Sequence, residues 1–589
     1  YWYWPNEEIF WIIFGAPVIA VPVFISFRLY RSVVRHMGVR ALWSTVQAAS
    51  LYALAWGLLS YMAAIGGIPG VSGIPRSVIL INWMLTIIVI GGVRLVARWV
   101  FTKKNLFTNE EKTNVIIYGA GSAGRQLSHA LQLSREYLHV GYIDDRLAED
   151  RAYINNIPVF AYNNIQKIID KKNVSEVLLA LPSVSRKKRN EIIEKLSPLP
   201  VHVRSLPSVS ELAEGKVKID DLLEIDTRDL LGRELAIPNQ QLLKTKITDK
   251  VVLVTGAGGS IGSELCRQIL FLKPKRLILF ENSESSLYQI EQELININTA
   301  NIVISAVIGS IRELKRMKNI FNYYGVQTIY HAAAYKHVPL VEYNQSQGVL
   351  NNSIGTMLAA EAAISEKVET FVLISTDKAV RPTSTMGATK RVAELVLQAF
   401  AKQSHNTCFT MVRFGNVLDS SGSVIPLFKK QIKKGGPITV TDFNMVRYFM
   451  TIPEAVELVI QAGAMSKGGD VFVLDMGSPV KIYDLAVKMI LLSGLQVLDD
   501  NNPDGDIEII CTGLRPGEKL FEELLVGSNI TETENRLIFK AQEEMIDWEN
   551  LKPILNELNE ASINTELERI RKLLIQIVPE FKPNSHTIG

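Results

Sequence analysis

A glycine-rich turn between an apolar strand and a helix constrains this fold more than any other feature. Gly256, Gly259 and Gly262 follow the strand-like run 251–254. Glycines at this spacing let the chain turn tightly and bring backbone N–H groups to a pyrophosphate at a helix N-terminus. The predicted dinucleotide contacts are Gly256, Gly259, Ser260, Ile261 and Gly262.

The next strand, 276–280, ends in a carboxylate, Glu281. A carboxylate at this position accepts hydrogen bonds from the adenosine ribose hydroxyls and repels a 2′-phosphate. The pattern therefore favours NAD over NADP as the cofactor.

Further strand-like runs at 302–308, 328–330 and 371–375 alternate with helical segments. This alternation predicts a parallel, doubly wound α/β sheet. Small residues at Ala332 and Ala333 let the backbone approach a cofactor.

The strand 371–375 delivers Thr376, Asp377 and Lys378 at its carboxyl end. Open α/β sheets bind their ligands at that edge. We therefore expect the three polar side chains to line the reaction cleft.

Lys390 follows Met386 by four residues, so the two share one face of a helix. In dehydrogenases of this type the pair is Tyr and Lys, and methionine cannot transfer a proton. An inactive binding module is therefore one interpretation. The retained Thr376, Asp377, Lys378 and Lys390 favour an active site instead.

Composition excludes several classes of function. The 589 residues carry a net charge of only +3, which gives no case for nucleic-acid binding. The three cysteines lie far apart without a CxxC motif, and the eight histidines form no HxxxH or HxH pair, so we expect neither disulfides nor a metal site. Because the chain begins at Tyr1 rather than Met, we expect a fragment or a processed product.

Three uncharged apolar runs, Ile9–Phe27, Ala41–Pro75 and Ser77–Val93, open the chain. A membrane-spanning helix needs roughly 20 apolar residues, so we expect about three spans within residues 1–104. Buried core helices are the alternative, and a signal peptide fits less well because three runs occur. Within these runs there is no Asp, Glu or Lys, which argues against transport.

The basic residues predict the orientation of these spans. Arginines and lysines gather between the first two runs and after the third, whereas the 66–76 turn holds one arginine. Positive loops stay in the cytoplasm. We therefore expect a multi-pass protein of the inner membrane whose segment after residue 104 is cytoplasmic.

A second glycine motif at Gly119, Gly121 and Gly124 follows the strand 114–118, and Asp144 and Asp145 lie at the expected place for a ribose-binding acid. This motif alone leaves two interpretations open, nucleotide binding and a Rossmann-like fold kept for structure or regulation. The expected boundaries are a membrane part at 1–104, a Rossmann-like domain at 105–205, a linker at 206–235 and a catalytic domain at 236–589.

Several motifs together give the chain a family resemblance over residues 105–589. They are TGAGGSIGSE (255–264), HAAAYKHVPLVE (331–342), NNSIGT (351–356), STDKAVRPTSTMGATKR (375–391), RFGNV (413–417), GSVIPLF (422–428), RYFMT (447–451) and GLRPGEKLFEELL (513–525). The chain resembles the long, membrane-anchored bacterial nucleoside-diphosphate-sugar 4,6-dehydratases, in particular those acting on UDP-N-acetylglucosamine for glycan synthesis. These are extended short-chain dehydrogenases, and their long members also carry Met in place of Tyr.

Two residues depart from the family pattern. Ser310 stands where the family often has Asp, which puts an adenine contact in doubt, and Asp419 stands where it usually has Gly.

The resemblance implies an internal redox reaction. Hydride leaves sugar C4 for the nicotinamide, the C5 proton and the C6 hydroxyl are lost as water, and hydride returns to C6. Lys378 is the candidate C5 base, provided that burial and nearby cations lower its pKa. Asp377 is the candidate acid for the C6 hydroxyl, Thr376 hydrogen-bonds near O4, and Lys390 holds the nicotinamide ribose. O4 loses its proton either to water or to Asp377, which would then act both on O4 and on the C6 hydroxyl. The sequence leaves both alternatives open.

Guanidinium groups match phosphate oxygens, so Arg447 and Arg515 are candidate clamps for the diphosphate, with ordinary surface ion pairs as the alternative. By resemblance, Glu518 binds the uridine ribose and Asn416 a phosphate or the sugar. Further residues expected by resemblance are Lys336 and His337 for the substrate and Ile311, Ala332 and Ala333 for the cofactor.

We also expect a homo-oligomer. A UDP-sugar 4-epimerase and an inactive membrane-bound regulator of glycan assembly are the competing functions.

Overall fold

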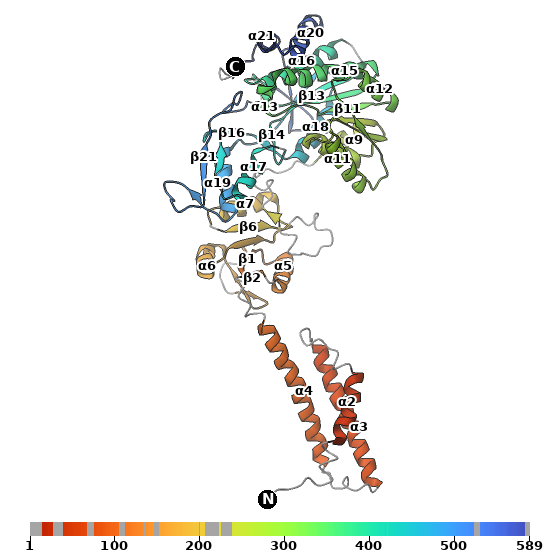
Figure 1. Ribbon diagram of the computed structural model, residues 1–589, viewed down its shortest axis with the longest axis vertical. Coiled ribbons are helices and arrows are strands. Elements are labelled where there is room, and N and C mark those ends of the chain that lie inside the picture. The colour runs from red at the N-terminus through yellow and green to blue at the C-terminus, as the bar shows by residue number, and fades with distance from the viewer. Residues whose placement is uncertain are drawn as a thin grey trace. The chain divides into compact units, whose positions relative to one another are not determined.

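The structure is a computed structural model of the chain (Figure 1). It describes residues 14–27, 39–66, 76–104, 112–134, 136–145, 152–199, 201–206, 223–224, 238–403, 406–420, 422–523 and 530–583. The chain divides into two compact units, Tyr1–Lys112 and Thr113–Gly589.

The described residues of the first unit form the helices α2 (Ala16–Ser26), α3 (Val39–Ile65) and α4 (Arg76–Lys104), and α3 packs against both others. Phe24 and Tyr52 meet edge to face at 5.9 Å between their ring centroids. These contacts make a small apolar core between helices whose outer faces are also apolar.

One helical segment of the described residues, Trp43–Ile65, is long and apolar enough to cross a membrane. Ala16–Ser26 and Ser77–Val93 are apolar but shorter. The prediction of three spans therefore stays a prediction. The orientation prediction rests on the 28–38 loop and the 67–75 turn, which lie outside the described residues.

The second unit begins with a Rossmann-like domain. Its seven-stranded sheet runs in the order β3 (Ala152–Ile154), β4 (Ile157–Phe160), β2 (Tyr137–Ile143), β1 (Thr113–Tyr118), β5 (Glu176–Leu179), β6 (His202–Ser205), β7 (Leu223–Glu224). The central strands are parallel, and β3 and β7 pair antiparallel at the edges. The connecting helices are α5 (Ser122–Leu133), α6 (Ile165–Lys172) and α7 (Arg186–Leu196).

The glycine turn of this domain is tightly closed. Gly119 has φ of 106°, and a Cβ at Gly124 would lie 1.9 Å from the Gly119 carbonyl oxygen, so only glycine fits there. The Oδ2 atom of Asp144 accepts a 3.1 Å hydrogen bond from the backbone N–H of Ala120. The acid thus lies beside the turn, and nucleotide binding there remains a prediction.

The larger sheet has nine strands, of which the first seven in spatial order are parallel. Their order is β10 (Val303–Ile308), β9 (Arg276–Glu281), β8 (Val251–Thr255), β11 (Thr328–His331), β12 (Thr370–Ile374), β13 (Cys408–Arg413), β18 (Asp470–Leu474), followed by antiparallel β23 (Ile538–Ala541) and β22 (Ile530–Glu532). The predicted doubly wound parallel sheet is confirmed.

The apolar residues of β8 show why its sequence does not alternate between polar and apolar. Val251 and Leu253 join the core on one face of the sheet, and Val252 and Val254 join the core on the other. Both faces are buried under helices, as in other parallel sheets. One face packs on α12 (Leu314–Tyr324), α15 (Gly355–Ser365), α16 (Thr385–Lys402), α20 (Trp548–Ile563) and α21 (Leu567–Ile577), and the other on α9 (Gln240–Thr245), α10 (Ser260–Phe271), α11 (Glu284–Ile297) and α18 (Ile452–Met465).

Segments that follow β13 build a smaller lobe with its own apolar core. It contains α17 (Val424–Lys433), α19 (Ile482–Leu492), β14 (Asn416–Val417), β15 (Ile438–Val440), β16 (Val446–Arg447), β17 (Phe449–Met450), β19 (Val480–Lys481), β20 (Val497–Leu498) and β21 (Ile507–Cys511). The lobe faces the carboxyl ends of the parallel strands, where the candidate site lies.

Candidate active site

A cavity of about 910 Å³ extends from the glycine turn after β8 to the smaller lobe. It begins where the strand order reverses between β8 and β11, the position at which open α/β sheets bind ligands. The sequence-predicted residues that line it are Gly256, Gly259, Ser260, Ile261, Gly262, Ala332, Lys336, His337, Thr376, Lys378, Met386, Lys390, Asn416, Arg447, Arg515 and Glu518.

The glycine turn has no room for larger residues. Gly256 has φ of 65°, and a Cβ there would lie 2.8 Å from the Cα of Ala333. A Cβ at Gly262 would lie 1.9 Å from the Gly256 carbonyl oxygen. The turn therefore brings bare backbone and the N-terminus of α10 to the cavity, an arrangement suited to a pyrophosphate.

Glu281 holds the same turn from the side. Its Oε2 atom accepts a 3.0 Å hydrogen bond from the N–H of Gly258, and its Oε1 atom accepts from the N–H groups of Asn282 and Ser283. These bonds fix the carboxylate at the end of β9. Ile311 lies in the apolar core and packs against Gly355.

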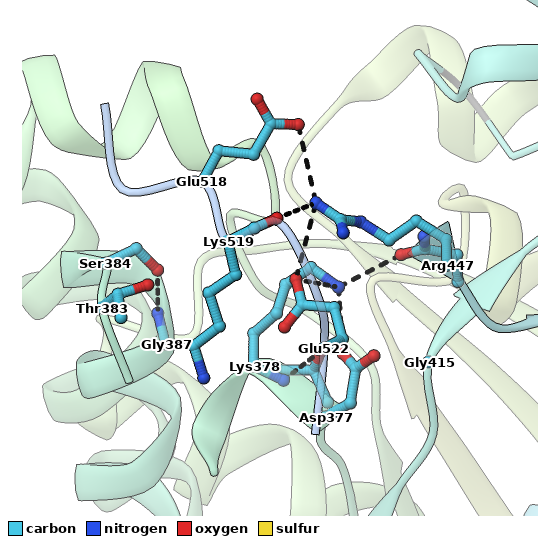
Figure 2. Close-up of polar contacts among 12 residues, drawn as sticks. Asp377, Lys378, Thr383, Ser384, Gly387, Gly415, Arg447, Glu518, Lys519 and Glu522 are labelled. Carbon is cyan, nitrogen blue, oxygen red and sulfur yellow. Dashed lines mark hydrogen bonds and ion pairs between the residues drawn. The ribbon is translucent and has the colours of Figure 1, made fainter. Parts of the chain in front are cut away.

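The Thr376–Lys378 triplet follows β12 as predicted, and Figure 2 shows the contact between Asp377 and Lys378. The hydroxyl of Thr376 donates to Asp377 Oδ1 at 2.9 Å. Lys378 Nζ donates to the same oxygen at 2.9 Å and to Asn416 Oδ1 at 3.1 Å. An acid and an amine thus stand side by side. Thr376 and Lys378 line the cavity as predicted, whereas Asp377 is buried and is not among the lining residues.

The expectation for the pKa of Lys378 is wrong for this arrangement. Burial lowers the pKa, but the carboxylates of Asp377 and Glu522 outweigh burial and hold it above its usual value. Arg447 is the one cation that opposes them. The sequence could not reveal this, because Glu522 reaches Lys378 from a distant part of the chain.

Glu522 is a site residue that the sequence reasoning missed. Its Oε1 atom lies 3.7 Å from Lys378 Nζ and 4.0 Å from an Arg447 nitrogen. Figure 2 shows the carboxylate between Arg447 and the Asp377–Lys378 pair. Its position inside the quoted 513–525 motif was the only available signal.

Met386 and Lys390 lie on the first turns of α16, and both line the cavity. Met386 is buried, and Lys390 Nζ donates a 2.7 Å hydrogen bond to the carbonyl oxygen of Ile374. Burial lowers the pKa of Lys390 to about 8, although Glu394 opposes the shift. A lysine with this pKa changes its charge close to physiological pH.

A buried ion network behind the triplet was also missed. Glu394 accepts from Arg413 Nε at 2.8 Å and from the hydroxyl of Ser375 at 2.6 Å, and it pairs with Arg391 at 3.1 Å. Burial opposes ionisation of Glu394, but the two arginines outweigh it and lower the pKa to about 2. The network ties α16 to the residue that precedes the Thr376–Lys378 triplet.

Arg447 uses three of its five N–H donors to hold backbone carbonyl oxygens. Its NH1 donates to the carbonyl oxygens of Val446 and Leu520, and its NH2 donates to that of Lys519. The side chain is buried and ties the segment around 519–522 to β16. Arg447, which the sequence analysis predicts to bind the diphosphate, therefore also has a structural role.

The other predicted substrate residues surround the same part of the cavity. Glu518 Oε2 accepts a 3.2 Å hydrogen bond from the N–H of Arg515, and its Oε1 lies 3.7 Å from Arg447. Arg515 is exposed at the cavity rim. His337 lies against Gly422, where an added Cβ would come within 2.5 Å of the imidazole ring.

Comparison with known proteins agrees with this geometry. Residues 252–543 match the polysaccharide biosynthesis protein family, and residues 26–207 match the CoA-binding domain family.

Three relatives extend the comparison. The chain is 42% identical over 454 residues to the capsular polysaccharide biosynthesis protein CapD of Staphylococcus aureus, covering 76% of this chain and 74% of the relative. It is 42% identical over 446 residues to the probable polysaccharide biosynthesis protein EpsC of Bacillus subtilis, covering 75% and 73%. It is 33% identical over 295 residues to a UDP-glucose 4-epimerase of Rickettsia rickettsii, covering 49% and 81%. The chain therefore belongs to the CapD- and EpsC-like polysaccharide biosynthesis proteins, a sugar-nucleotide dehydratase and epimerase family of extended short-chain dehydrogenases.

Proposed function

We propose that this protein is an NAD-dependent 4,6-dehydratase that converts UDP-N-acetylglucosamine to a UDP-4-keto-6-deoxy sugar for surface glycan synthesis. The observation that carries the proposal is the 2.9 Å contact between Asp377 and Lys378, because Lys378 lines the cavity and Asp377 adjoins it. Loss of water across C5 and C6 needs both an acid and a base beside one substrate.

The residues around the glycine turn suit NAD. The turn at 256–262 approaches the pyrophosphate with bare backbone, Glu281 faces the adenosine ribose, and Lys390 holds the nicotinamide ribose. NAD, when bound, supplies the removal of hydride from C4 and its return to C6.

The side chains on the opposite wall move the protons. Lys378 takes the C5 proton, and Asp377 gives a proton to the C6 hydroxyl, which leaves as water. Thr376 orients Asp377 through its 2.9 Å hydrogen bond. Met386 occupies the usual tyrosine position without a proton to transfer, so O4 loses its proton to water or to Asp377.

A 4-epimerase of UDP-sugars is the second candidate, because one relative carries that name. Epimerisation at C4 needs neither an acid for C6 nor a base for C5, so the Asp377–Lys378 pair argues against it. An inactive regulator would leave this buried, charged cluster without a use.

Proton NMR of the detergent-solubilised chain incubated with UDP-N-acetylglucosamine tests the proposal. A new methyl doublet indicates dehydration. A changed ring pattern without a methyl signal indicates epimerisation, and an unchanged spectrum supports the regulator. The double variant D377N/K378A is the control that identifies the cluster as the source of the signal.

We further propose that the apolar N-terminal part anchors the enzyme in the cytoplasmic membrane. The helix at Trp43–Ile65 supports this proposal, since its length and apolar character suit a membrane span. The catalytic part is then cytoplasmic, on the side where sugar nucleotides are made.

A further inference from the structure

We propose that Glu522 takes the proton from the Lys378 ammonium and thereby prepares the amine to act as the C5 base. The inference rests on the proposed dehydratase function and deepens it. It assigns to Glu522 the role of a positioning residue, because the carboxylate acts on the substrate through Lys378.

The position of Glu522 suits this role. Its side chain is 4% exposed and lines the cavity, and its Oε1 atom lies 3.7 Å from Lys378 Nζ. Hydrogen bonds of catalytic groups are often long in a ligand-free protein and tighten when substrate binds. A shortening of about 1 Å would bring the two groups to hydrogen-bond distance, at which direct proton transfer is possible.

The second oxygen of Glu522 carries the stronger argument. Oε2 is buried, and among the described residues it has no hydrogen-bond partner. A buried carboxylate oxygen without a donor is costly when it is charged. The cost disappears when the group carries a proton, so the surroundings favour a carboxyl that accepts one.

Asp377 is less suited to the same task. Its Oδ1 atom already accepts two hydrogen bonds, one from Lys378 Nζ and one from the Thr376 hydroxyl. In the proposed reaction Asp377 enters as the acid and gives its proton to the C6 hydroxyl. It cannot also accept the proton of Lys378, so a second carboxylate is needed for that step.

The charges around Glu522 come from three elements. Asp377 and Lys378 follow β12, Arg447 belongs to β16, and Lys519 precedes Glu522 in its own segment. Burial raises the pKa of Glu522 and Asp377 adds to this rise, while the three cations oppose it. Arg447 is also 3.7 Å from the carboxylate of Glu518, so it interacts with two carboxylates.

The proposed step conserves charge and atoms. An N–H bond of the Lys378 ammonium breaks and an O–H bond forms on Glu522, which converts an ion pair into a neutral amine and a neutral acid. The amine then takes the C5 proton. Because the proton stays within the pair, forming the reactive amine requires no loss of a proton to solvent, and its amount does not depend on pH while the pair holds one proton.

The test compares three variants of the full-length chain. E522Q removes the acceptor, E522D restores a carboxylate on a shorter side chain, and E523Q is the matched control. Glu523 is adjacent in sequence but pairs with Arg381 at 3.1 Å on a half-exposed surface. For each protein, kcat and KM for UDP-N-acetylglucosamine are measured against pH, together with solvent deuterium incorporation at C5.

We expect E522Q to lose roughly 10²-fold in kcat near neutral pH, with KM changed by less than about threefold. Below about pH 8, where Lys390 keeps its charge, its kcat should rise with pH because Lys378 must then lose its proton to solvent, whereas the kcat of the parent should be nearly flat. E522D should recover part of the loss, and E523Q should match the parent. The near-ultraviolet absorbance of reduced nicotinamide should still appear on mixing, because C4 oxidation precedes the C5 step.

Three results would overturn the proposal. The first is E522Q with the parent's rate and pH profile. The second is a loss that does not depend on pH or lies in KM alone, which indicates a structural ion pair. The third is E522Q without the absorbance signal, which indicates a damaged site. A parent chain that forms no methyl doublet would overturn the dehydratase proposal as well, and so differs from failure of the Glu522 role alone.

Discussion

The amine of Lys390 donates a 2.7 Å hydrogen bond to the carbonyl oxygen of Ile374, the last residue of β12. This contact joins α16 to the strand that carries the Thr376–Lys378 triplet. It also places a titratable cation, with a pKa lowered to about 8, in the wall of the cavity.

The pH dependence of activity should report this lysine. Lys390 is protonated below its pKa and neutral above it, so the positive potential beside O4 is lost as pH rises through about 8. We expect kcat/KM to fall on the alkaline side. K390R keeps its charge at all accessible pH values and should lower the rate but remove that fall. If kcat/KM of K390R falls at alkaline pH as it does in the parent, the fall comes from the titration of another group.

The buried ion network should be a large source of stability. Glu394 has no exposed surface, and R413M leaves its carboxylate with only Arg391 and Ser375 as partners. We expect a loss of about 3–5 kcal/mol in the free energy of unfolding, since breaking a buried pair leaves an uncompensated charge. Thermal unfolding of the purified chain measures it.

K402M is the matched control for that variant. Lys402 pairs with Asp547 at 2.6 Å, but both side chains are more than half exposed. Solvent screens such pairs, so K402M should unfold at the parent temperature. Equal losses of unfolding free energy in R413M and K402M would show that burial does not determine how much an ion pair contributes to stability.

Glu281 should govern cofactor occupancy. Its oxygens accept hydrogen bonds from three backbone N–H groups, which hold it at the ribose position. We expect E281A to bind NAD roughly 10- to 100-fold more weakly, since hydrogen bonds to a charged group contribute about 1.5–3 kcal/mol. E284A, one residue beyond the cap of α11, is the control. Isothermal titration measures both, and tighter binding of NADP than NAD to the parent would contradict the assignment.

Local patterns predicted the parts of the site whose members lie close together in sequence. The glycine turn, Glu281 and the Met386–Lys390 pair follow from spacing along a single strand or helix. Glu522 could not be found in this way, because the smaller lobe brings it to Lys378 from the far end of the motif at 513–525.

Two properties that the sequence could not supply have the same origin. The pKa of Lys378 depends on a second carboxylate that only the folded lobe supplies. The NH1 and NH2 groups of Arg447 donate to the backbone carbonyl oxygens of Val446, Lys519 and Leu520. The sequence pattern does not predict where these carbonyl groups point. Composition and spacing identify charged groups, but their partners arise from tertiary structure.

The membrane topology is a separate prediction from the arginine distribution. A cysteine introduced at Ser72 should react with an impermeant thiol reagent on intact cells, and one introduced at Asn109 should react only after lysis. Both positions lie outside the described residues. Cys511 is exposed and should stay unlabelled in intact cells, because the catalytic part is then cytoplasmic. The opposite labelling pattern would reverse the orientation.

The methionine at position 386 gives the last prediction. Met386 is buried at the start of α16 and lines the cavity, four residues before Lys390. If water or Asp377 takes the O4 proton, M386Y should remain active, with kcat changed by about tenfold or less in either direction. One positioned acid–base group typically contributes ~10²–10⁴, but another route already exists here. D377N and K378A should lose far more, because they remove the C6 acid and the C5 base. Solvent deuterium incorporation at C5 and C6, measured with the rate, separates these steps. An inactive M386Y beside nearly normal D377N and K378A would overturn this assignment of roles.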